Sequence, residues 1–396
     1  MPLISIVRAF FVLLSLALLA VAVYLLWSWY DGDLVRDGAG VLHRFREGWR
    51  LWTGLGLLAW SFLGRFILPL LVARRDSHPT HARRGHGQVF PGGGGASLYV
   101  ETHGAPDAPV IVMTHGWGLD STIWHYAKQD LASKFRLVLW DLPGMGRSRL
   151  AKDGAVSLER FARDLLSVIE RAGPAPVVLV GHSIGGMTIQ TLARDHPTLF
   201  ASRVAGVVLV NTTYTNPLKT MALSGLAQAL RRPVLEPMMR LAVWLQPLAW
   251  LSAWQSYLSG SAHLANRIGF GRAVTASQLE QTTLLTTRNP PGALAKGNLA
   301  MFRWDATAAL PGLACPALVI GGDLDIVTKL EASSTIAAKA PGAELKVVEG
   351  VNHMGFLERS DLYNRAIADF ASAVQPVAGP KPAARRRRAP ARASKA

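Results

Sequence analysis

Ser183 stands in a sequence pattern that could make it a nucleophile. It lies in VVLVGHSIGG, residues 177–186, where an apolar run leads directly into Gly181, the serine and Gly185. A strand that enters G-x-S-x-G and continues as a helix holds its serine on a strained turn, with the hydroxyl exposed at the sheet edge. Glycine is expected at both positions because neighbouring backbone leaves no room for a side chain at this turn. A serine hydroxyl alone is a weak nucleophile, so the chain must also supply a base.

His353 is the predicted base. It lies in VEGVNHMGFLE after the last strand-like run, at the carboxyl edge of the expected sheet, where Ser183 should also lie. His182 adjoins the serine in sequence, but we expect its side chain to point away from it. His115 opens the turn HGWG, and we expect His115 and Gly116 to support that turn rather than to react.

An imidazole base needs an orienting acid at its other ring nitrogen. The stretch GGDLDIV offers Asp323 and Asp325 directly after a strand-like run. Asp325 stands three residues past Gly322, at the loop position that usually turns toward the histidine, so it is the predicted acid. Asp323 is expected to cap or solvate the turn.

The negative oxygen of a tetrahedral intermediate needs hydrogen-bond donors. Two preorganised backbone N–H groups suit this purpose, and each is worth about 2.7–4 kcal/mol by mutation. One is expected from Ile184, because the first N–H groups of a helix have no partner within the helix. The other is expected from the loop after VIVMTHG, at Trp117. The roles of the Trp117 indole and of Gly118 stay open at this point.

Five motifs in order give the chain a family resemblance. HGWG, DLPGMGRS (141–148), GHSIGG, GGDLDIV and NHMGFLE together resemble the α/β-hydrolase superfamily, in its lidded branch with a serine nucleophile, over roughly residues 88–375. The resemblance implies a mostly parallel eight-stranded sheet, a lid, and turn-holding roles for Asp141 and Ser148. A serine rather than an aspartate nucleophile disfavours epoxide hydrolases and haloalkane dehalogenases. HGWG lacks the HGGG run of the hormone-sensitive-lipase-like branch.

Strand-like and helical stretches alternate around these motifs from about Ser97. Continuous short apolar runs are typical of strands buried on both faces of a parallel sheet. SLERFARDLLSVIERAG has helical spacing and opens at Ser157, while Glu159 and Glu331 suit the first turns of helices. The alternation predicts an α/β sheet with helices on both faces. The predicted strands lie in residues 110–116, 136–144, 177–183, 204–211, 317–322 and 344–350.

The alternation stops between residues 212 and 310, which precede the acid-bearing strand. This segment is predicted to form a helical cap over the carboxyl ends of the strands, where ligands bind. Its residues Trp244, Trp250 and Trp254 could form the core of the cap or an apolar lining of the site. The run PGGGG at 91–95 predicts a flexible joint before the catalytic core.

The amino-terminal run from Ala9 to Tyr30 is apolar apart from two serines. As a helix it is roughly 33 Å long, enough to cross the hydrocarbon core of a bilayer. A cleavable signal peptide is the alternative, with Arg8 as its charged leader and AVA at 20–22 as its cleavage site. The run continues through VYLLWSWY, whose aromatic residues suit a membrane interface, so an uncleaved anchor is favoured.

A second apolar stretch, Leu51 to Ala73, contains Arg65 and Pro69. It spans the membrane if Arg65 reaches the interface or faces a partner, and otherwise lies in the interface. RRDSHPTHARRGHG after it carries a net charge of +3, which the positive-inside rule places in the cytoplasm. Two spans would make a hairpin with a cytoplasmic catalytic domain, at the inner or plasma membrane. With a single span, the catalytic domain could instead lie on the side of the membrane away from the cytoplasm.

The charge and the cysteine content of the chain limit which binding partners and cofactors we expect. The net charge is +16, and residues 381–395 contribute seven basic residues without an acid. Such a tail is typical of a solvated, disordered segment, and an anionic lipid surface fits it better than nucleic acid, because no nucleic-acid module is recognisable. Cys315 is the only cysteine, and no Cys/His cluster has zinc spacing. We therefore expect no disulfide, metal or cofactor.

The predicted function is membrane-associated hydrolysis of carboxylic esters with a hydrophobic acyl group, through a Ser-His-Asp triad and an acyl-enzyme. The same triad could serve a cofactor-free haloperoxidase or perhydrolase, an acyltransferase or a C–C hydrolase. An inactive hydrolase fold that binds ligands at the membrane is the alternative of another class. The predicted segments are an anchor (1–75), a linker (76–96), a core in two parts (97–211 and 311–375) around a cap (212–310), and a basic tail (376–396).

Overall fold

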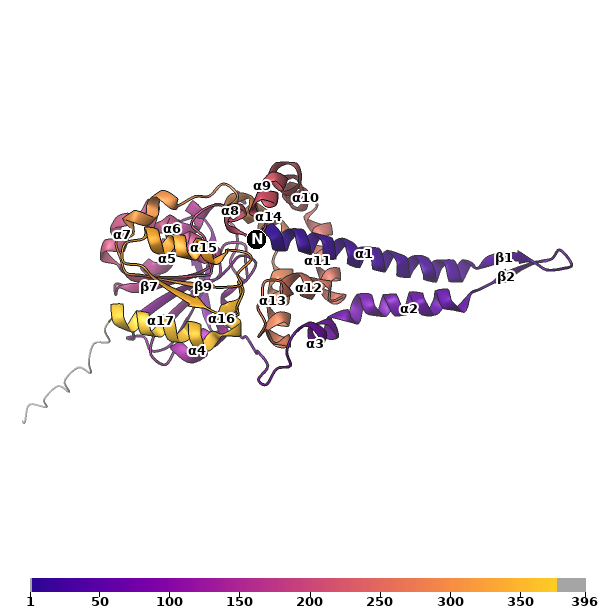
Figure 1. Cartoon of the computed structure of the whole chain (residues 1–396), viewed down its shortest axis with the longest axis horizontal. Helices are drawn as coiled ribbons and strands as arrows, with labels where there is room; N and C mark the ends of the chain where they lie inside the picture. Colours follow the sequence, from indigo (N-terminus) through magenta and orange to yellow (C-terminus); the bar gives the residue numbers. More distant parts are fainter. Residues whose placement is uncertain (1, 376–396) are drawn as a thin grey trace, which may run out of the picture.

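An eight-stranded sheet forms the centre of the protein (Figure 1). The computed structural model describes residues 2–375, with side chains from residue 6 onward, so the predicted basic tail lies outside the described residues. The strand order is β10-β9-β8-β7-β5-β6-β4-β3. The strands are β3 (Gly87–Pro91), β4 (Ser97–His103), β5 (Val110–Thr114), β6 (Arg136–Trp140), β7 (Val177–His182), β8 (Val204–Val210), β9 (Ala317–Gly322) and β10 (Glu344–Val348).

The six strands from β5 to β10 run parallel and coincide with the six predicted apolar runs. Their central members are buried along their whole length, which explains why the runs are continuous rather than alternating. The α/β sheet is therefore confirmed. The antiparallel strands β4 and β3 at one edge had not been predicted from the apolar pattern.

Helices cover both faces of the sheet. One face packs against α5, α6, α7 and α15, and the other against α4, α16 and α17. Helix α5 begins as predicted, because the Ser157 side chain accepts a hydrogen bond from the Arg160 N–H at 3.2 Å. The bounds are α4 (His125–Leu131), α5 (Leu158–Arg171), α6 (Ile184–Asp195), α7 (Pro197–Ser202), α15 (Leu330–Lys339), α16 (Gly355–Glu358) and α17 (Ser360–Val374), with a short 3-10 helix at Ser121–Trp124.

The glycine run at 91–95 is the turn of the β3–β4 hairpin, so the prediction of a flexible joint is wrong. Its backbone packs on α5: the Gly94 N–H donates to Asp164 Oδ1 at 2.8 Å, and the Gly93 N–H donates to Ser167 Oγ at 2.9 Å. A Cβ on Gly94 would lie 2.5 Å from the Arg160 carbonyl oxygen. Residues 87–96 therefore belong to the sheet rather than to the predicted linker.

A set of helices between β8 and β9, which we call the cap, occupies the predicted insertion. Trp244 and Trp250 lie on its outer surface, 78% and 47% exposed, and Trp254 packs against Tyr257. Neither the core nor the site-lining interpretation therefore holds for Trp244 and Trp250. The cap comprises α8 (Pro217–Thr220), α9 (Ser224–Leu230), a π-helical turn (Arg231–Leu235), α10 (Glu236–Trp244), α11 (Gln246–Leu258), α12 (Ser261–Arg267), α13 (Ala276–Arg288) and α14 (Pro291–Met301), and a 3-10 helix (Thr307–Gly312) follows it.

The amino-terminal segment forms a helical hairpin that projects from the cap (Figure 1). Helix α1 runs outward with its first residues beside the cap, a short β-hairpin forms the far end, and α2 returns along α1. Of the described helices, only α1 is long and apolar enough to cross a membrane, with a mean hydropathy of 2.8 over an 18-residue window within Ile6–Asp31. The bounds are α1 (Pro2–Asp31), β1 (Asp33–Arg36), β2 (Leu42–Phe45), α2 (Gly48–Leu63), a 3-10 turn (Gly64–Phe66) and α3 (Leu68–Val72).

The second apolar stretch is not one continuous helix. Helix α2 ends at Leu63, and Arg65 in the following turn bonds the hydroxyl of Tyr257 on α11 at 2.7 Å and lies 3.8 Å from the Glu280 carboxylate on α13. Arg65 therefore faces a protein partner in the cap, which was one of the two alternatives. The stretch then continues as α3, which packs against α12 and α13.

Gly94→Ala tests whether the glycine turn is structural. The new Cβ would overlap the Arg160 carbonyl oxygen, so we expect a loss of about 1–3 kcal/mol in the free energy of unfolding, measured as a lower melting temperature. Gly312→Ala is the control, because no atom lies within 4 Å of the position that its Cβ would take, and the substitution should be close to neutral. Equal melting temperatures for both variants would restore the flexible-joint interpretation.

Candidate active site

Ser183 lies on a strained turn between β7 and α6. Its φ of 55° and ψ of −117° are rare for a residue with a side chain. The turn fits because helix α6 comes very close to β5 and β7: a Cβ on Gly185 would lie 2.3 Å from the Thr114 carbonyl oxygen, and one on Gly181 would lie 2.5 Å from the Gly185 carbonyl carbon. The glycines at both positions are therefore a steric requirement, as predicted.

His353 is paired with Asp325. Its Nδ1 lies 2.9 Å from Asp325 Oδ2, and both side chains are buried. A carboxylate oxygen only accepts, so Nδ1 carries the proton and Nε2 is left with a lone pair. Among the described residues Nε2 has no hydrogen-bond partner, and His353 lines a cavity. This is the tautomer that a general base requires.

Asp325 is the better placed of the two candidate acids. Its Oδ1 accepts the N–H groups of Val327 at 2.8 Å and Thr328 at 2.9 Å, and its Oδ2 accepts the Thr328 hydroxyl and the Asn211 amide. Burial alone would raise the pKa of Asp325, but His353 and these hydrogen bonds outweigh burial and lower it. Asp323 is exposed and only accepts a long bond from the Val351 N–H at 3.3 Å.

Asn211 is a positioning residue that the sequence analysis missed. It directly follows β8 with a φ of 44°, donates to Asp325 and accepts from the Tyr363 hydroxyl at 2.9 Å. The available signal was its place directly after the apolar run of residues 204–210, at the same carboxyl edge of the sheet as the acid. An amide there can bond the outer lone pair of a buried carboxylate.

His182 connects the serine turn to the His353 loop. Its Nε2 donates to the His353 carbonyl oxygen at 3.0 Å, and the two rings lie 4.8 Å apart. Burial, with His353 nearby, lowers the pKa of His182 well below its ordinary value, so the ring is neutral. The side chain therefore braces the loop of the candidate base, in agreement with its exclusion as a base.

The HGWG turn is fixed on both sides. His115 Nε2 accepts the Leu142 N–H at 2.9 Å, and its Nδ1 donates to the Gly116 carbonyl oxygen at 2.8 Å. A Cβ on Gly116 would lie 2.5 Å from His182 Nδ1. His115 and Gly116 thus support the HGWG turn, as expected from the sequence. Asp141 and Ser148 support the DLPGMGRS turn in the same way, because the Ser148 hydroxyl donates to the Asp141 carbonyl oxygen at 2.6 Å.

The Trp117 indole anchors this turn to the cap. Its Nε1 donates to the Leu294 carbonyl oxygen on α14 at 3.0 Å, and its ring lies where a Cβ on Gly297 would be. Gly118 has a φ of +80°, and its carbonyl accepts the Asn289 amide at 2.8 Å. In the described part of the chain the backbone N–H groups of Trp117 and Ile184 donate to no protein acceptor, so both remain available to a ligand.

A small cavity of about 80 Å³ lies between this turn, the His353 loop and the cap. One of its lining residues, Arg8, comes from helix α1, and this contribution could not be predicted from the sequence. The others combine apolar and polar side chains of the catalytic core and of α12 to α14. The lining residues are Arg8, Trp117, Gly118, Leu119, His182, Asn266, Gly269, Thr282, Thr286, Leu294, Asn298, His353 and Met354.

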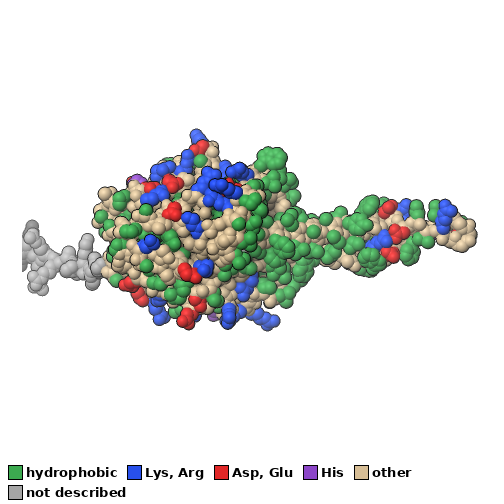
Figure 2. All heavy atoms as spheres, turned by 45° about the horizontal axis from the view of Figure 1, so that its top comes forward, with side chains coloured by type: hydrophobic (Ala, Val, Ile, Leu, Met, Phe, Trp, Pro, Cys, Tyr) green, Lys and Arg blue, Asp and Glu red, His purple; other side chains and the backbone are tan. Residues whose placement is uncertain are grey.

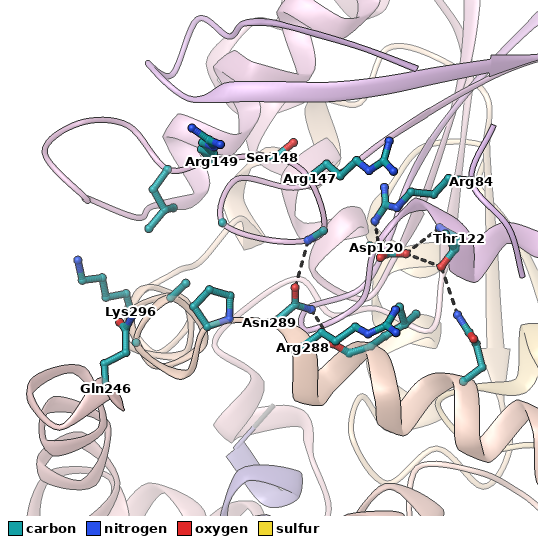
Figure 3. A pocket seen from close by; sticks show the side chains of 18 of the residues that line it. Arg84, Asp120, Thr122, Arg147, Ser148, Arg149, Gln246, Arg288, Asn289 and Lys296 are labelled. Carbon is teal, nitrogen blue, oxygen red and sulfur yellow. Dashed lines mark hydrogen bonds and ion pairs between the residues drawn. The ribbon is translucent and has the colours of Figure 1, made fainter. Parts of the chain in front are cut away.

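A larger groove of about 1050 Å³ lies between the loop around Arg147 and the junction of α13 and α14 (Figure 3). Arg84 in this groove is neutralised by Asp120 and Asp141, whereas Arg288 forms no ion pair with any described residue. None of the candidate triad residues lines the groove, so we take the smaller cavity as the candidate active site. Its basic residues are Arg83, Arg84, Arg147, Arg149, Arg288 and Lys296.

Comparison with known proteins identifies the class. A sequence model of the alpha/beta hydrolase fold matches residues 109–360, which are more than half of the chain. The chain therefore belongs to the α/β hydrolase family and is a hydrolase, as its motifs predicted. The matched region begins after the helical hairpin, so Arg8 lies outside it.

Its relatives include two proteins named pimeloyl-[acyl-carrier protein] methyl ester esterase. The protein from Nitrosospira multiformis is 27% identical over 293 residues, 70% of this chain and 99% of the relative. The protein from Sodalis glossinidius is 28% identical over 285 residues, 69% of this chain and 97% of the relative. The catalytic domain thus corresponds to nearly the whole of each relative, while part of this chain extends beyond the aligned region.

Solved structures share the fold. An esterase from Exiguobacterium antarcticum matches with a TM-score of 0.59 at 20% identity, covering 72% of this chain and 100% of that chain. A bromoperoxidase from Bacillus anthracis matches with a TM-score of 0.59 at 19% identity, covering 72% and 99%. Because both chemistries occur on this fold, the likeness does not choose between them.

Asp325→Asn tests the charge of the buried acid. A group with a lowered native pKa stabilises the fold above its unfolded pKa, about 3.9 for aspartate, and loses that contribution as the pH falls through the native pKa. The substitution should therefore cost about 1–3 kcal/mol at pH 7 and progressively less below about pH 4, measured by thermal unfolding across pH. The exposed Asp323→Asn should change little at any pH. A loss that does not depend on pH would contradict an ionised Asp325.

Proposed function

We propose that the protein is a serine hydrolase of carboxylic esters, with Ser183 as nucleophile, His353 as base and Asp325 as the orienting acid. The observation that carries the proposal is the 2.9 Å bond from His353 Nδ1 to Asp325, on a loop braced against the strained turn of Ser183. The ester-cleaving relatives support the same reaction class.

In the first half-reaction, Ser183 Oγ attacks the ester carbonyl carbon as its proton moves to His353 Nε2. The C–O bond to the alcohol then breaks, and the leaving oxygen takes the proton from Nε2. In the second half-reaction, water attacks the acyl-enzyme and gives its proton to Nε2. The bond to Ser183 Oγ breaks, the serine recovers the proton, and the carboxylic acid leaves. Asp325 keeps its charge throughout and stabilises the imidazolium.

The backbone N–H groups of Trp117 and Ile184 are the proposed oxyanion donors. Their lack of protein acceptors among the described residues supports this role, and so does the rigidity of the two turns that carry them. Trp117, Leu119, Leu294 and Met354 give the cavity an apolar side, which suits an acyl group. At about 80 Å³ the cavity as it stands fits a short acyl group rather than a long chain.

We further propose that the helical hairpin crosses a membrane. Helix α1 is long and apolar enough, and Figure 2 shows hydrophobic side chains along the hairpin that continue onto the cap, with charged side chains at the far end of the hairpin. Aromatic side chains are exposed near the far end, at Trp27, Tyr30 and Trp52, and also at Trp244 on the cap. Two aromatic zones at the ends of an apolar surface are typical of membrane interfaces.

Helix α2, which runs back toward the cap, is shorter than helix α1. Helix α2 has 16 residues and is therefore about 24 Å long, whereas a hydrocarbon core is about 30 Å thick. The exposed Leu241, Leu248 and Leu251 of the cap make up this difference if the outer face of the cap enters the interface. With the positive segment at residues 74–87, this arrangement favours a cytoplasmic catalytic domain.

Ser183→Ala tests the nucleophile. We expect it to abolish labelling by a fluorophosphonate probe, which reacts with activated serines, and to lower kcat for short acyl esters at least about 1000-fold. Ser202→Ala, an exposed serine on α7, is the control and should label and react like the wild type. Asp325→Asn should lose about 10⁴-fold in kcat while Asp323→Asn stays near the wild type. Equal labelling of Ser183→Ala and the wild type would refute the assignment.

Single cysteines test the crossing. Gly38→Cys lies in the loop between β1 and β2, and Ser202→Cys lies on the catalytic domain. In sealed vesicles, an impermeant maleimide added outside should label one of them, and the other only after the vesicles are opened. The native Cys315 contributes little background, because burial raises the pKa of its thiol to about 12. Labelling of both cysteines from the same side would show that the hairpin does not cross.

A further inference from the structure

Arg8 brings a positive charge from the membrane-type helix into the catalytic cavity. It lines the same cavity as His353 and Trp117. The side chain is partly buried between the cap and the catalytic core, where the amino-terminal end of α1 lies in Figure 1. Since the family match begins at residue 109, neither this helix nor its arginine belongs to the shared catalytic machinery.

The guanidinium of Arg8 has more donors than protein acceptors. It can donate five hydrogen bonds, yet among the described residues it makes one long contact, 3.5 Å from Nη2 to the Thr286 carbonyl oxygen, and pairs with no carboxylate. Other cations at the hairpin base are neutralised: Arg65, for example, lies beside Glu280. A guanidinium in a partly desolvated site without a counter-ion favours binding of an anion.

A second polar group in this cavity also lacks a partner. Thr282 on α13 is 4% exposed, and its buried hydroxyl has no hydrogen-bond partner among the described residues. Thr282 lines the cavity together with Arg8, Thr286 and Asn266. Thr282 lies one helical turn before Thr286, whose carbonyl oxygen Arg8 contacts. A carboxylate in this cavity could therefore accept from both the guanidinium and the unsatisfied hydroxyl.

The position of Arg8 is fixed by contacts farther along α1. Ser15 is buried and its hydroxyl donates to Gln255 Oε1 on α11 at 2.5 Å, while the Gln255 amide donates back to the Ser15 carbonyl oxygen at 3.4 Å. Ile6 packs against the apolar cluster of the cap that contains Leu218 and Phe302. Arg8 lies between these two attachments in the sequence, so the helix backbone at Arg8 is held beside the cavity.

We propose that Arg8 and Thr282 form an anion subsite, and that the substrate is a short ester that carries a carboxylate at the far end of its acyl group. Half-esters of small dicarboxylic acids have this chemistry. A carboxylate matches the planar fork of a guanidinium, and the cavity of about 80 Å³ excludes the two long chains of a phospholipid. This proposal rests on the proposed ester hydrolysis by Ser183 and names its substrate class.

Turnover of matched esters tests the subsite. The probes are the monoethyl esters of succinic, glutaric and adipic acids, each compared with the neutral ester in which an amide replaces the carboxylate. We expect the wild type to prefer at least one half-ester over its amide by about tenfold or more. Arg8→Gln should raise KM for that half-ester about 10- to 100-fold with little change in kcat, and leave the amide within about threefold. Thr282→Val should cause a smaller loss in the same direction.

Further variants test whether the effect of Arg8→Gln comes from the lost anion subsite rather than from a general loss of positive charge or a changed orientation of the hairpin. Arg288→Gln removes a cation from the larger groove, near the end of the same helix α13 as Thr282, and should not change the preference (Figure 3). Arg8→Lys keeps the charge that orients a membrane helix but loses the fork, so it should recover only part of the preference. Maleimide labelling of Gly38→Cys in the Arg8→Gln background checks that the hairpin keeps its orientation.

Binding without turnover separates this proposal from the proposed reaction. Succinate, glutarate and adipate are titrated by calorimetry into the full-length Ser183→Ala protein, with and without Arg8→Gln. We expect at least one dicarboxylate to bind Ser183→Ala and Arg8→Gln to weaken that binding at least tenfold. Absence of binding and of half-ester preference would overturn the subsite even if neutral esters are cleaved. Binding that depends on Arg8, without any ester turnover, would support the subsite and overturn the ester hydrolysis instead.

Discussion

The close approach of helix α6 to strand β5 is the constraint on which the candidate site depends. Gly185 lies against the Thr114 carbonyl so closely that no side chain fits. That contact sets where α6 begins, and Ser183 must take a φ of 55° to connect β7 to it. The strain is tolerated because both neighbouring strands are buried and well packed. The same packing holds the HGWG turn and His182 beside the serine.

The loops around this turn are held by buried polar groups rather than by apolar contact. Asp325 is buried with acceptors satisfied by His353, Thr328 and Asn211, so its charge is tolerated in the interior. His182 bonds the His353 backbone rather than its ring. Two ring nitrogens of this network have no hydrogen-bond partner among the described residues, His182 Nδ1 and His353 Nε2, and both residues line the cavity.

The sequence predicted what short-range patterns determine. Buried parallel strands require continuous apolar runs, and a strand–serine–helix turn requires glycines, so the six strands and the turn of Ser183 were located correctly. The β3–β4 hairpin was missed because its glycines are ordered by Asp164 on a distant helix. The partner of Arg65 and the place of Arg8 depend on how the hairpin packs against the cap, which no local pattern encodes.

Helix α1 has two roles that place opposite demands on its residues. Along most of its length it exposes apolar side chains such as Phe10, Leu13 and Trp27, which are unfavourable in water and favourable in lipid. At its amino-terminal end it contributes Arg8 to a cavity that contains His353. If lipid covers the outer part of the helix, insertion holds the inner end against the cap, because Ser15 and Gln255 join the two parts. On this proposal the cavity wall would be coupled to the membrane through helix α1, whereas the candidate triad residues lie in the turns that follow β7, β9 and β10.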